Sequence, residues 1–433
     1  MLSGNWLAAA LVFVVAACAG PARPSTESAG DATGSSAPKH LTTAIASAPP
    51  RFVRWMSPPA IELAGAAELE ALLTTGLGTA DGAGGLDTGL AEQVPTIENG
   101  LWKVAPDGRM ETTWKIRSNA YWHDGTPVTA ADLLFTAEIR RDRELPLSPS
   151  LAYQFVQDIQ ALATDTVQAT WKSPFIGADT LFSGPFLPKH LLEPTYRQDK
   201  TAFTDLSYWT SGLVNTGPFK LQQWTPGSGV LLVANDQYAL GRPHIDEMEV
   251  KFLQDPSTLL ANILSDAVEM TLGRTLSLDQ ALQVRDQWRG GHVDLAFSQW
   301  IVIYPEFINP NPAMIANLDF RRALVHALDR QQMVDNFMFG LTSVTDTLLY
   351  PGQRDYEQFI ARAPKYPFDA RRATEMMGTL GYQRSADGLL RDSANQPLAL
   401  EIRTSAGDDQ QEKSLFASAD DWRKLGITVD TVL

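Results

Sequence analysis

Apolar and polar positions along the body of the chain follow two different periods. Four short runs are apolar throughout or alternate with a period of two, which predicts β-strands: residues 114–117, 230–233, 248–252 and 398–402. Residues 129–132 read Thr-Ala-Ala-Asp, which is typical of a capping box. We expect the helix that they open to bury Leu133, Leu134 and Ala137.

A longer helical pattern begins after Asp319. Its apolar residues recur at helical spacing, and Gly340 stands where the helix is expected to stop: Leu324, Ala327, Leu328, Val334 and Met338. Asp387-Gly388 predicts a turn further along the chain. Strand-like runs that alternate with helical ones predict an α/β architecture with more than one lobe.

The N-terminal residues follow a pattern of their own. Residues 7–17 are an unbroken apolar run, which is too short to span a bilayer as a helix but suits the core of a signal peptide. The run ends in residues 15–18 (VAAC), which resemble the lipobox of bacterial lipoproteins. This resemblance implies that the Cys18 thiol is acylated and that cleavage leaves Cys18 as the first mature residue. The alternative is an ordinary cleaved signal peptide with an incidental cysteine.

Residues 19–39 consist mainly of Ala, Gly, Pro, Ser and Thr. Such a composition cannot bury a core, so we expect a flexible tether. A tether of this kind spans about 25 Å for about 20 residues, which would hold a folded body just off a membrane.

Composition and charge exclude some classes of protein. The chain has 433 residues, enough for two or three domains, with 44% hydrophobic and 20% charged residues. This balance is that of a globular protein and argues against bulk disorder. The formal net charge of -15 at pH 7 argues against a nucleic-acid partner, because most of the surface would repel a phosphate backbone.

The chain offers few ligands for a metal. Cys18 is the only cysteine, so the chain forms no intramolecular disulfide and no cysteine-built zinc site. The six histidines are scattered, with no two of them one helical turn apart. We therefore expect neither a metal centre nor a cofactor.

Two local motifs resemble chemical sites but have simpler interpretations. His123 and Asp124 can both move protons, yet they belong to an Asp-Gly turn closely followed by Pro127, so we expect a structural role. Residues 76–82 (GLGTADG) approach a phosphate-binding loop. However, Asp81 stands where the third glycine is needed and its carboxylate would repel a phosphate, which favours a flexible surface loop.

A series of motifs in this order resembles the extracellular solute-binding proteins of family 5, which include peptide-binding and nickel-chelate-binding lipoproteins. The most specific is WHDGTPVTAAD at residues 122–132. The others surround it along the chain: residues 101–102, 107–108, 114–117, 187–192, 215–220 (NTGPFK), 235–238, 320–324 (FRRAL), 327–330, 366–369 and 380–382. The resemblance covers about residues 41–433 and implies a bilobal, periplasmic-binding-protein-like (type II) α/β fold with an extra subdomain.

The sequence departs from the family in two places. Ala239 stands where family members usually have a tryptophan. Family members also continue beyond the position of Leu433, so the resemblance implies that the C-terminal part of the fold is missing. In peptide-binding members that part carries the aspartate that pairs with the α-amine of the ligand. The implied organisation is a signal peptide at 1–18, a tether at 19–39, lobe I at 40–75 and 179–270, the extra subdomain at 76–178 and an incomplete lobe II at 271–433.

The resemblance implies a binding protein and no enzyme. It predicts an exported monomer, lipid-anchored at the outer face of the cell membrane or in the periplasm. This protein would capture peptides or similar small solutes reversibly between its lobes and deliver them to an ABC permease. Oligosaccharides, opine-like compounds and metal chelates remain open as solutes. The alternatives are a secreted hydrolase of peptides or glycans, because two carboxylates need only meet in space, and a surface sensor on the same scaffold.

Candidate ligand contacts come from the segments that resemble the inter-lobe region of the family. Arg274 is suited to pairing with a carboxylate in a bidentate manner. Gln299, Trp300 and Tyr304 follow in the next such segment, where the two aromatic residues would form apolar walls with a polar edge. The simpler interpretation places Trp300 in a core and Arg274 on the solvated surface.

Overall fold

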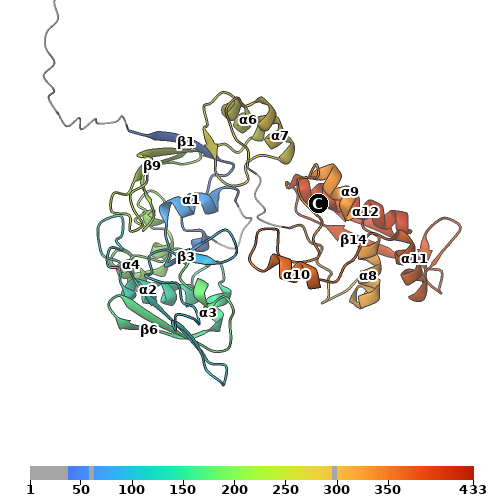
Figure 1. Cartoon of the computed structure of the whole chain (residues 1–433), viewed down its shortest axis with the longest axis horizontal. Coiled ribbons are helices and arrows are strands. Elements are labelled where there is room, and N and C mark those ends of the chain that lie inside the picture. Colours follow the sequence, from blue (N-terminus) through green and yellow to red (C-terminus); the bar gives the residue numbers. More distant parts are fainter. Residues whose placement is uncertain (1–37, 58–62, 295–299) are drawn as a thin grey trace, which may run out of the picture. The chain divides into compact units, whose positions relative to one another are not determined.

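The computed structural model describes residues 38–57, 63–294 and 300–433 (Figure 1). We call residues 38–294 the N-terminal region and residues 300–433 the C-terminal region. The predicted lipidation site Cys18 and the candidate ligand contact Gln299 lie outside the described residues. Within those described ranges, no helix combines the length and the hydrophobicity that crossing a bilayer requires.

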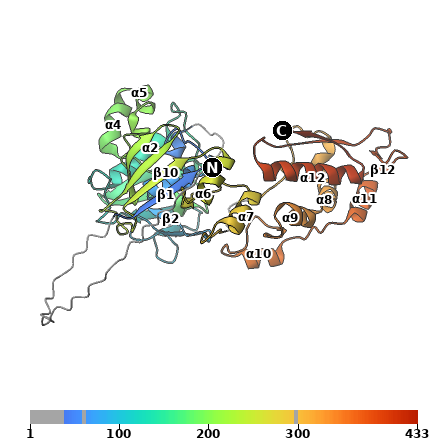
Figure 2. The ribbon, with the colours of Figure 1, turned by 90° about the horizontal axis from the view of Figure 1, so that it is seen from above.

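A five-stranded sheet with the strand order β11-β1-β10-β9-β8 is the centre of the N-terminal region. Its strands are β1 (His40–Ile45), β8 (Phe219–Thr225), β9 (Gly229–Ala234), β10 (Glu247–Phe252) and β11 (Met270–Thr271). β1 runs parallel to β10 and β11, while β10, β9 and β8 are antiparallel; Figure 2 shows β1 beside β10. The predicted strands at residues 230–233 and 248–252 are confirmed as parts of β9 and β10.

Helices cover this sheet with apolar side chains. They are α1 (Ala66–Leu73), α4 (Lys189–Gln198), α5 (Lys200–Thr204), α6 (Pro256–Leu264) and α7 (Leu278–Gln287). Leu69 and Leu73 of α1 lie in one core with Ile45. Leu259 and Ile263 of α6 and Val284 of α7 form a second core with Ala44.

A second, four-stranded antiparallel sheet forms a subdomain of its own. Its order is β4-β5-β7-β6, from β4 (Trp102–Val104), β5 (Met110–Lys115), β6 (Val156–Ala163) and β7 (Thr166–Trp171). Buried and partly buried residues alternate along β5 and β7, so one face of the sheet packs on α2 (Ala130–Arg141) and α3 (Leu151–Phe155). The predicted capping box is confirmed, since the Thr129 N–H donates to the Asp132 carboxylate at 2.8 Å. Leu133 and Ala137 are buried as expected, while Leu134 is half-buried.

The glycine-rich residues 76–82 were expected to form a flexible surface loop, and this prediction is wrong. Gly78–Ala80 is strand β2, which pairs antiparallel with β3 (Leu86–Thr88). Leu77 is fully buried, and its N–H donates to the Phe182 carbonyl at 2.8 Å. Burial of this one leucine and the backbone pairing outweigh the conformational freedom of the glycines.

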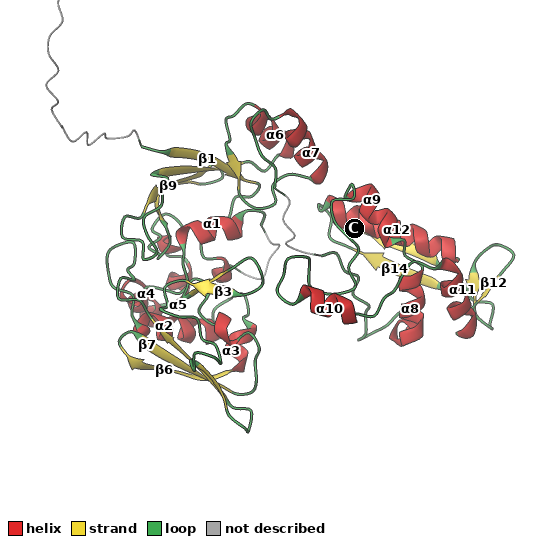
Figure 3. Cartoon of the chain, viewed as in Figure 1, coloured by secondary structure: helices red, strands yellow, loops and turns green. Residues whose placement is uncertain are grey.

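The C-terminal region is a smaller α/β unit in which helices dominate (Figure 3). Its two-stranded parallel sheet pairs β14 (Ala399–Arg403) with β15 (Thr428–Val432), and β12 (Gln383–Arg384) pairs with β13 (Leu390–Arg391). The helices are α8 (Leu318–His326), α9 (Arg330–Phe337), α10 (Tyr356–Arg362), α11 (Ala370–Thr379) and α12 (Asp409–Leu425). The predicted turn at Asp387-Gly388 is confirmed, and it joins β12 to β13.

The single long helix predicted after Asp319 is in fact two helices. α8 ends at His326, and α9 begins after Asp329, whose carboxylate accepts the Gln332 N–H at 2.9 Å. An aspartate in this role satisfies an N–H group that would otherwise have no partner in the first turn of a helix. The periodic apolar pattern therefore continues across a break that a capping residue creates.

Candidate functional site

The carboxyl ends of the parallel strands β11, β1 and β10 meet at one edge of the five-stranded sheet. The chain continues from these ends with two further backbone hydrogen bonds, from the Leu272 N–H to the Ala44 carbonyl and from the Leu253 N–H to the Ile45 carbonyl, both at 2.9 Å. In open α/β sheets, ligands bind outside the carboxyl ends of the strands. This edge is therefore the candidate ligand site.

Polar side chains lie close to this edge. Ser47 follows β1 and is buried, yet its Oγ has no hydrogen-bond partner among the residues that the structure describes. Thr275, which follows β11 by four residues, is buried as well. A buried hydroxyl without a partner costs free energy, so Ser47 marks a position where a water molecule or a polar ligand atom would be stabilised.

Arg274 stands just beyond β11 and is half-exposed. Its Nη2 lies 2.8 Å from Oδ2 of Asp408, the residue that caps α12 and accepts the backbone N–H groups of Gln410 and Gln411. Burial by itself would raise the pKa of Asp408, but the hydrogen bonds from Arg274 and from the capped helix outweigh it and lower that pKa below its ordinary value. The guanidinium is thus held by a carboxylate that stays ionised at neutral pH.

Gly273 has no side chain, which allows Glu68 of α1 to lie close to the backbone next to Arg274. Gly273 has φ +70°, and a Cβ there would lie 2.8 Å from Oε2 of Glu68, so any other residue would displace that carboxylate. Glu68 is exposed on α1. A carboxylate therefore lies directly against the backbone beside Arg274.

Trp300 and Tyr304 are exposed, with 44% and 86% of their surface open to solvent. Trp300 is therefore not a core residue. No hydrogen bond or ion pair joins Arg274 to Trp300 or Tyr304 in the part of the chain that the structure describes. The polar partner of Arg274 in these residues is Asp408, and the predicted set with Gln299, Trp300 and Tyr304 remains a prediction.

Sequence reasoning missed Glu68 and Asp408. The start of a helix after Asp408 has a local signal, because an aspartate precedes a helical run. The partnership with Arg274 has none, because 134 residues separate the two along the chain.

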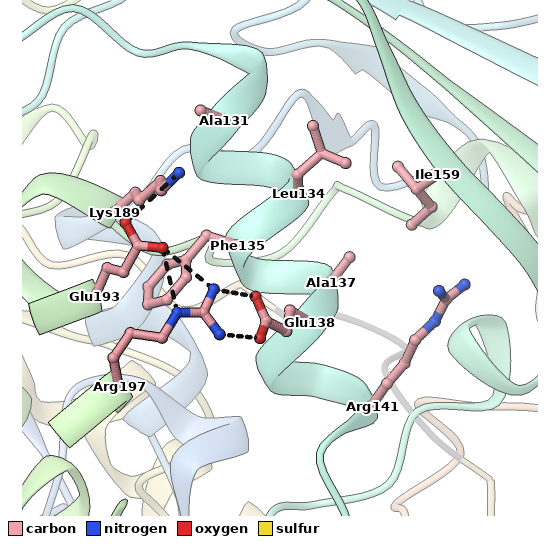
Figure 4. Close-up of a pocket in the computed structure, with 10 residues that line it drawn as sticks. All are labelled: Ala131, Leu134, Phe135, Ala137, Glu138, Arg141, Ile159, Lys189, Glu193 and Arg197. Carbon is pink, nitrogen blue, oxygen red and sulfur yellow. Dashed lines mark hydrogen bonds and ion pairs between the residues drawn. The ribbon is translucent and has the colours of Figure 1, made fainter. Parts of the chain in front are cut away.

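A hollow of about 520 Å³ lies elsewhere, on the outer side of α2 (Figure 4). Leu134 and Ala137 of α2 and Ile159 of β6 are among its apolar lining residues. On its α4 side, the Arg197 guanidinium bridges the carboxylates of Glu138 and Glu193. Nζ of Lys189 lies 3.5 Å from Oε2 of Glu193, so two cations offset these two carboxylates.

The turn residue His123 has the structural role expected from the sequence. It is buried, its Nδ1 accepts the Asn215 N–H at 3.2 Å, and its Nε2 lies 3.1 Å from the Gly217 carbonyl. Burial lowers the pKa of His123 to about 4, so the ring is neutral at physiological pH. Within the described residues, no group of three or more Asp, Glu, His or Cys side chains is placed to hold a metal ion.

The chain is similar in sequence to known solute-binding proteins. Residues 92–432 match the sequence profile of the family described as "Bacterial extracellular solute-binding proteins, family 5 Middle". The oligopeptide-binding protein AppA of Bacillus subtilis is 24% identical over 328 residues, which cover 75% of this chain. The same match covers 58% of AppA, so the chain spans less than two thirds of that relative.

Solved structures show the same fold. AppA of Bacillus subtilis in complex with a nonapeptide superposes with a TM-score of 0.67 at 21% identity, over 92% of this chain and 75% of that one. NikZ of Campylobacter jejuni in complex with Ni(L-His) has a TM-score of 0.67 at 20% identity, over 91% of this chain and 73% of that one. The predicted α/β fold of the periplasmic binding proteins is therefore confirmed.

Proposed function

The chain belongs to the bacterial extracellular solute-binding proteins of family 5, and from this premise we propose that it is the solute-binding component of an ABC importer. The observation that carries the proposal is the match of residues 92–432 to the family profile. In this role the protein binds a solute reversibly outside the cytoplasm, passes it to a membrane permease and makes or breaks no covalent bond in it.

Peptides are the proposed solute class. AppA, which is similar to this chain in sequence and fold, is an oligopeptide-binding protein, whereas the similar NikZ holds a nickel–histidine chelate. Both kinds of solute carry carboxylates. Arg274, at the carboxyl edge of the parallel strands, is the proposed partner of such a carboxylate, with Gln299, Trp300 and Tyr304 as further contacts.

Native mass spectrometry of the purified chain tests this proposal. The chain is mixed with an equimolar set of peptides of two to nine residues and, separately, with nickel–histidine. The expected result is a one-to-one adduct with unaltered solute mass, and Arg274→Lys should weaken binding because lysine cannot form the bidentate pair. A shortened peptide would identify a hydrolase, and the absence of an adduct with every solute would overturn the binding role.

Cys18 carries the proposed membrane anchor, and the protein is proposed to act as a monomer. We expect the wild-type chain in a bacterial host to incorporate labelled palmitate and to sediment with membranes, whereas Cys18→Ser should do neither. Equal membrane association of the two forms would show that the lipid anchor does not exist.

A further inference from the structure

The N-terminal and C-terminal regions share no apolar core. Each of the four clusters of buried apolar residues in the described chain draws its members from one region alone. The ion pairs behave differently, because three of those described join one region to the other: Asp81–Arg354, Arg274–Asp408 and Asp279–Lys413. Among the described residues, polar contacts therefore join the two regions, and none of the four buried apolar clusters spans them.

The first contact is the tip of the β2–β3 hairpin. Oδ1 of Asp81 accepts the N–H groups of Ala83 and Gly85 at 2.7 and 2.8 Å, which fixes the shape of the tip. Two interactions with Arg354 follow from that shape. The Arg354 N–H donates to the Ala83 carbonyl at 2.9 Å, and its Nη2 lies 3.4 Å from Oδ2 of Asp81.

The lack of a side chain at Gly85 leaves room for this approach. A Cβ on Gly85 would lie 2.5 Å from Oδ2 of Asp81 and 2.8 Å from Nη2 of Arg354. An alanine there would therefore push the carboxylate and the guanidinium away from the tip. Gly184 gives a matched comparison, because a Cβ at that position would meet nothing within 4 Å.

The second contact joins residues around α7 to the start of α12. Arg274 pairs with Asp408 at 2.8 Å, and Nζ of Lys413 lies 3.5 Å from Oδ2 of Asp279. Lys413 and Asp279 are both substantially exposed, so salt screens this pair strongly. Exposed pairs of this kind shift an equilibrium constant by about two- to fivefold each, which is enough to hold a contact and weak enough to release it.

We propose that these two patches form an ionic clasp, which holds the two regions together reversibly and whose hairpin half depends on Gly85. The clasp goes beyond the proposed function, because it is a property of the chain without solute. It also gives the glycine-rich residues 81–85 a role that neither phosphate binding nor a free loop supplies.

Single-molecule fluorescence transfer on the full chain without solute tests the clasp. Cys18→Ser removes the native thiol, and Ile176→Cys and Arg371→Cys place one exposed label site in each region. We expect the fraction of molecules with joined regions to fall as NaCl rises from 0.05 to 1 M. Arg354→Gln should lower that fraction about two- to fivefold at low salt and flatten its salt dependence.

Gly85→Ala should act like Arg354→Gln, while Gly184→Ala should leave the distribution unchanged. Exchanging the charges with Asp81→Arg and Arg354→Asp together should recover more of the joined state than either single change. The proposal of a clasp is overturned if the fraction of molecules with joined regions does not change with salt concentration. It is also overturned if Arg354→Gln and Lys413→Gln leave that fraction unchanged while circular dichroism shows folded protein. Solute binding is measured separately, so a failed clasp leaves the binding proposal intact.

Discussion

The N-terminal and C-terminal regions are packed by different means. Nearly all of the largest fully buried aromatic side chains lie in the N-terminal region: Trp114, Trp122, Trp171, Trp209, Phe182, Phe186 and Phe203. In the C-terminal region only Phe320 belongs to this set, and most of the exposed large apolar side chains of the described residues lie there. A two-stranded sheet is marginal by itself, so this region depends on the helices that cover β14 and β15.

This difference indicates that the N-terminal region is packed more tightly than the C-terminal region. Aromatic side chains bury large areas and pack edge-to-face or stacked, which gives the N-terminal region several rigid contacts. The C-terminal region leaves apolar area in water that another surface would cover favourably. The same chemical change should therefore have a large effect in one region and a small one in the other.

The largest expected effect comes from Trp171→Ala. The Trp171 ring is fully buried and stacks on Phe175 with centroids 5.5 Å apart, and its Nε1 donates to Oγ1 of Thr112 at 2.8 Å. We expect the free energy of unfolding to fall by about 3–5 kcal/mol in urea titrations followed by circular dichroism. Trp300→Ala, at an exposed tryptophan of the C-terminal region, should cost less than about 1 kcal/mol. Equal losses at the two positions would show that the packing contrast has no energetic meaning.

A partly buried carboxyl group in the N-terminal region, that of Glu70, gives the next effect. Burial raises the pKa of Glu70 to about 7, although the Arg54 N–H, which donates to its carboxylate at 2.7 Å, partly opposes the shift. The folded state therefore takes up the proton more readily than the unfolded state, whose pKa is 4.5. The favourable contribution is complete below pH 4.5 and is lost as the pH rises to about 7.

Glu70→Gln removes this titration and keeps an oxygen that accepts the Arg54 N–H. We expect the free energy of unfolding at pH 8 to rise by about 2 kcal/mol, with little change at pH 4. Urea titrations at the two pH values measure the difference. A variant that is less stable at pH 8 would mean that Glu70 is needed as an anion, contrary to its raised pKa.

Local patterns predicted the elements whose cause is local. Strands β9 and β10 of the five-stranded sheet follow from periodicity, and the capping box before α2 follows from two residues three positions apart. The hairpin at Gly78–Ala80 escaped prediction because its order comes from the burial of Leu77 against Phe182, a distant residue. The glycine-rich composition of residues 76–82 predicts flexibility, but tertiary contacts order Gly78–Ala80 as a strand.

The candidate site was only partly predictable for the same reason. Arg274 was singled out from the resemblance to a family, and the structure gives it a carboxylate partner 134 residues away. The approach of Glu68 to Gly273 depends on how α1 packs beside the end of β11. No local sequence pattern predicts this packing. Tertiary geometry sets both pairings, so a local sequence pattern cannot predict them.

A smaller effect is expected at the break between α8 and α9. The Asp329 carboxylate caps α9, a helix that has no buried residue. Asp329→Ala should lower the free energy of unfolding by about 1 kcal/mol and speed amide hydrogen exchange along Arg330–Phe337, because little packing holds this helix once the cap is lost. Asp329→Ser keeps a capping oxygen and should behave nearly as wild type. Exchange that is unchanged in Asp329→Ala would show that α9 is held by contacts other than its cap.

The smallest effect on stability is expected in the exposed apolar run from Trp300 to Tyr304, where the contrast between the regions is sharpest. Ile303 is 44% exposed and belongs to none of the four apolar clusters of the described residues, so Ile303→Lys should change the free energy of unfolding by less than about 0.5 kcal/mol. Its effect on association should be larger, because a charge interrupts an apolar, β-prone segment that is open to other chains. Light scattering during slow heating should show aggregation starting at a higher temperature in Ile303→Lys than in wild type. Leu162→Lys, at a 54% exposed position of the N-terminal region, is the matched control and should shift that temperature less, because the exposed residues of β6 already include Gln157, Asp158 and Gln160. An equal shift in both variants would mean that added charge alone suppresses aggregation and that the C-terminal run has no special part in it.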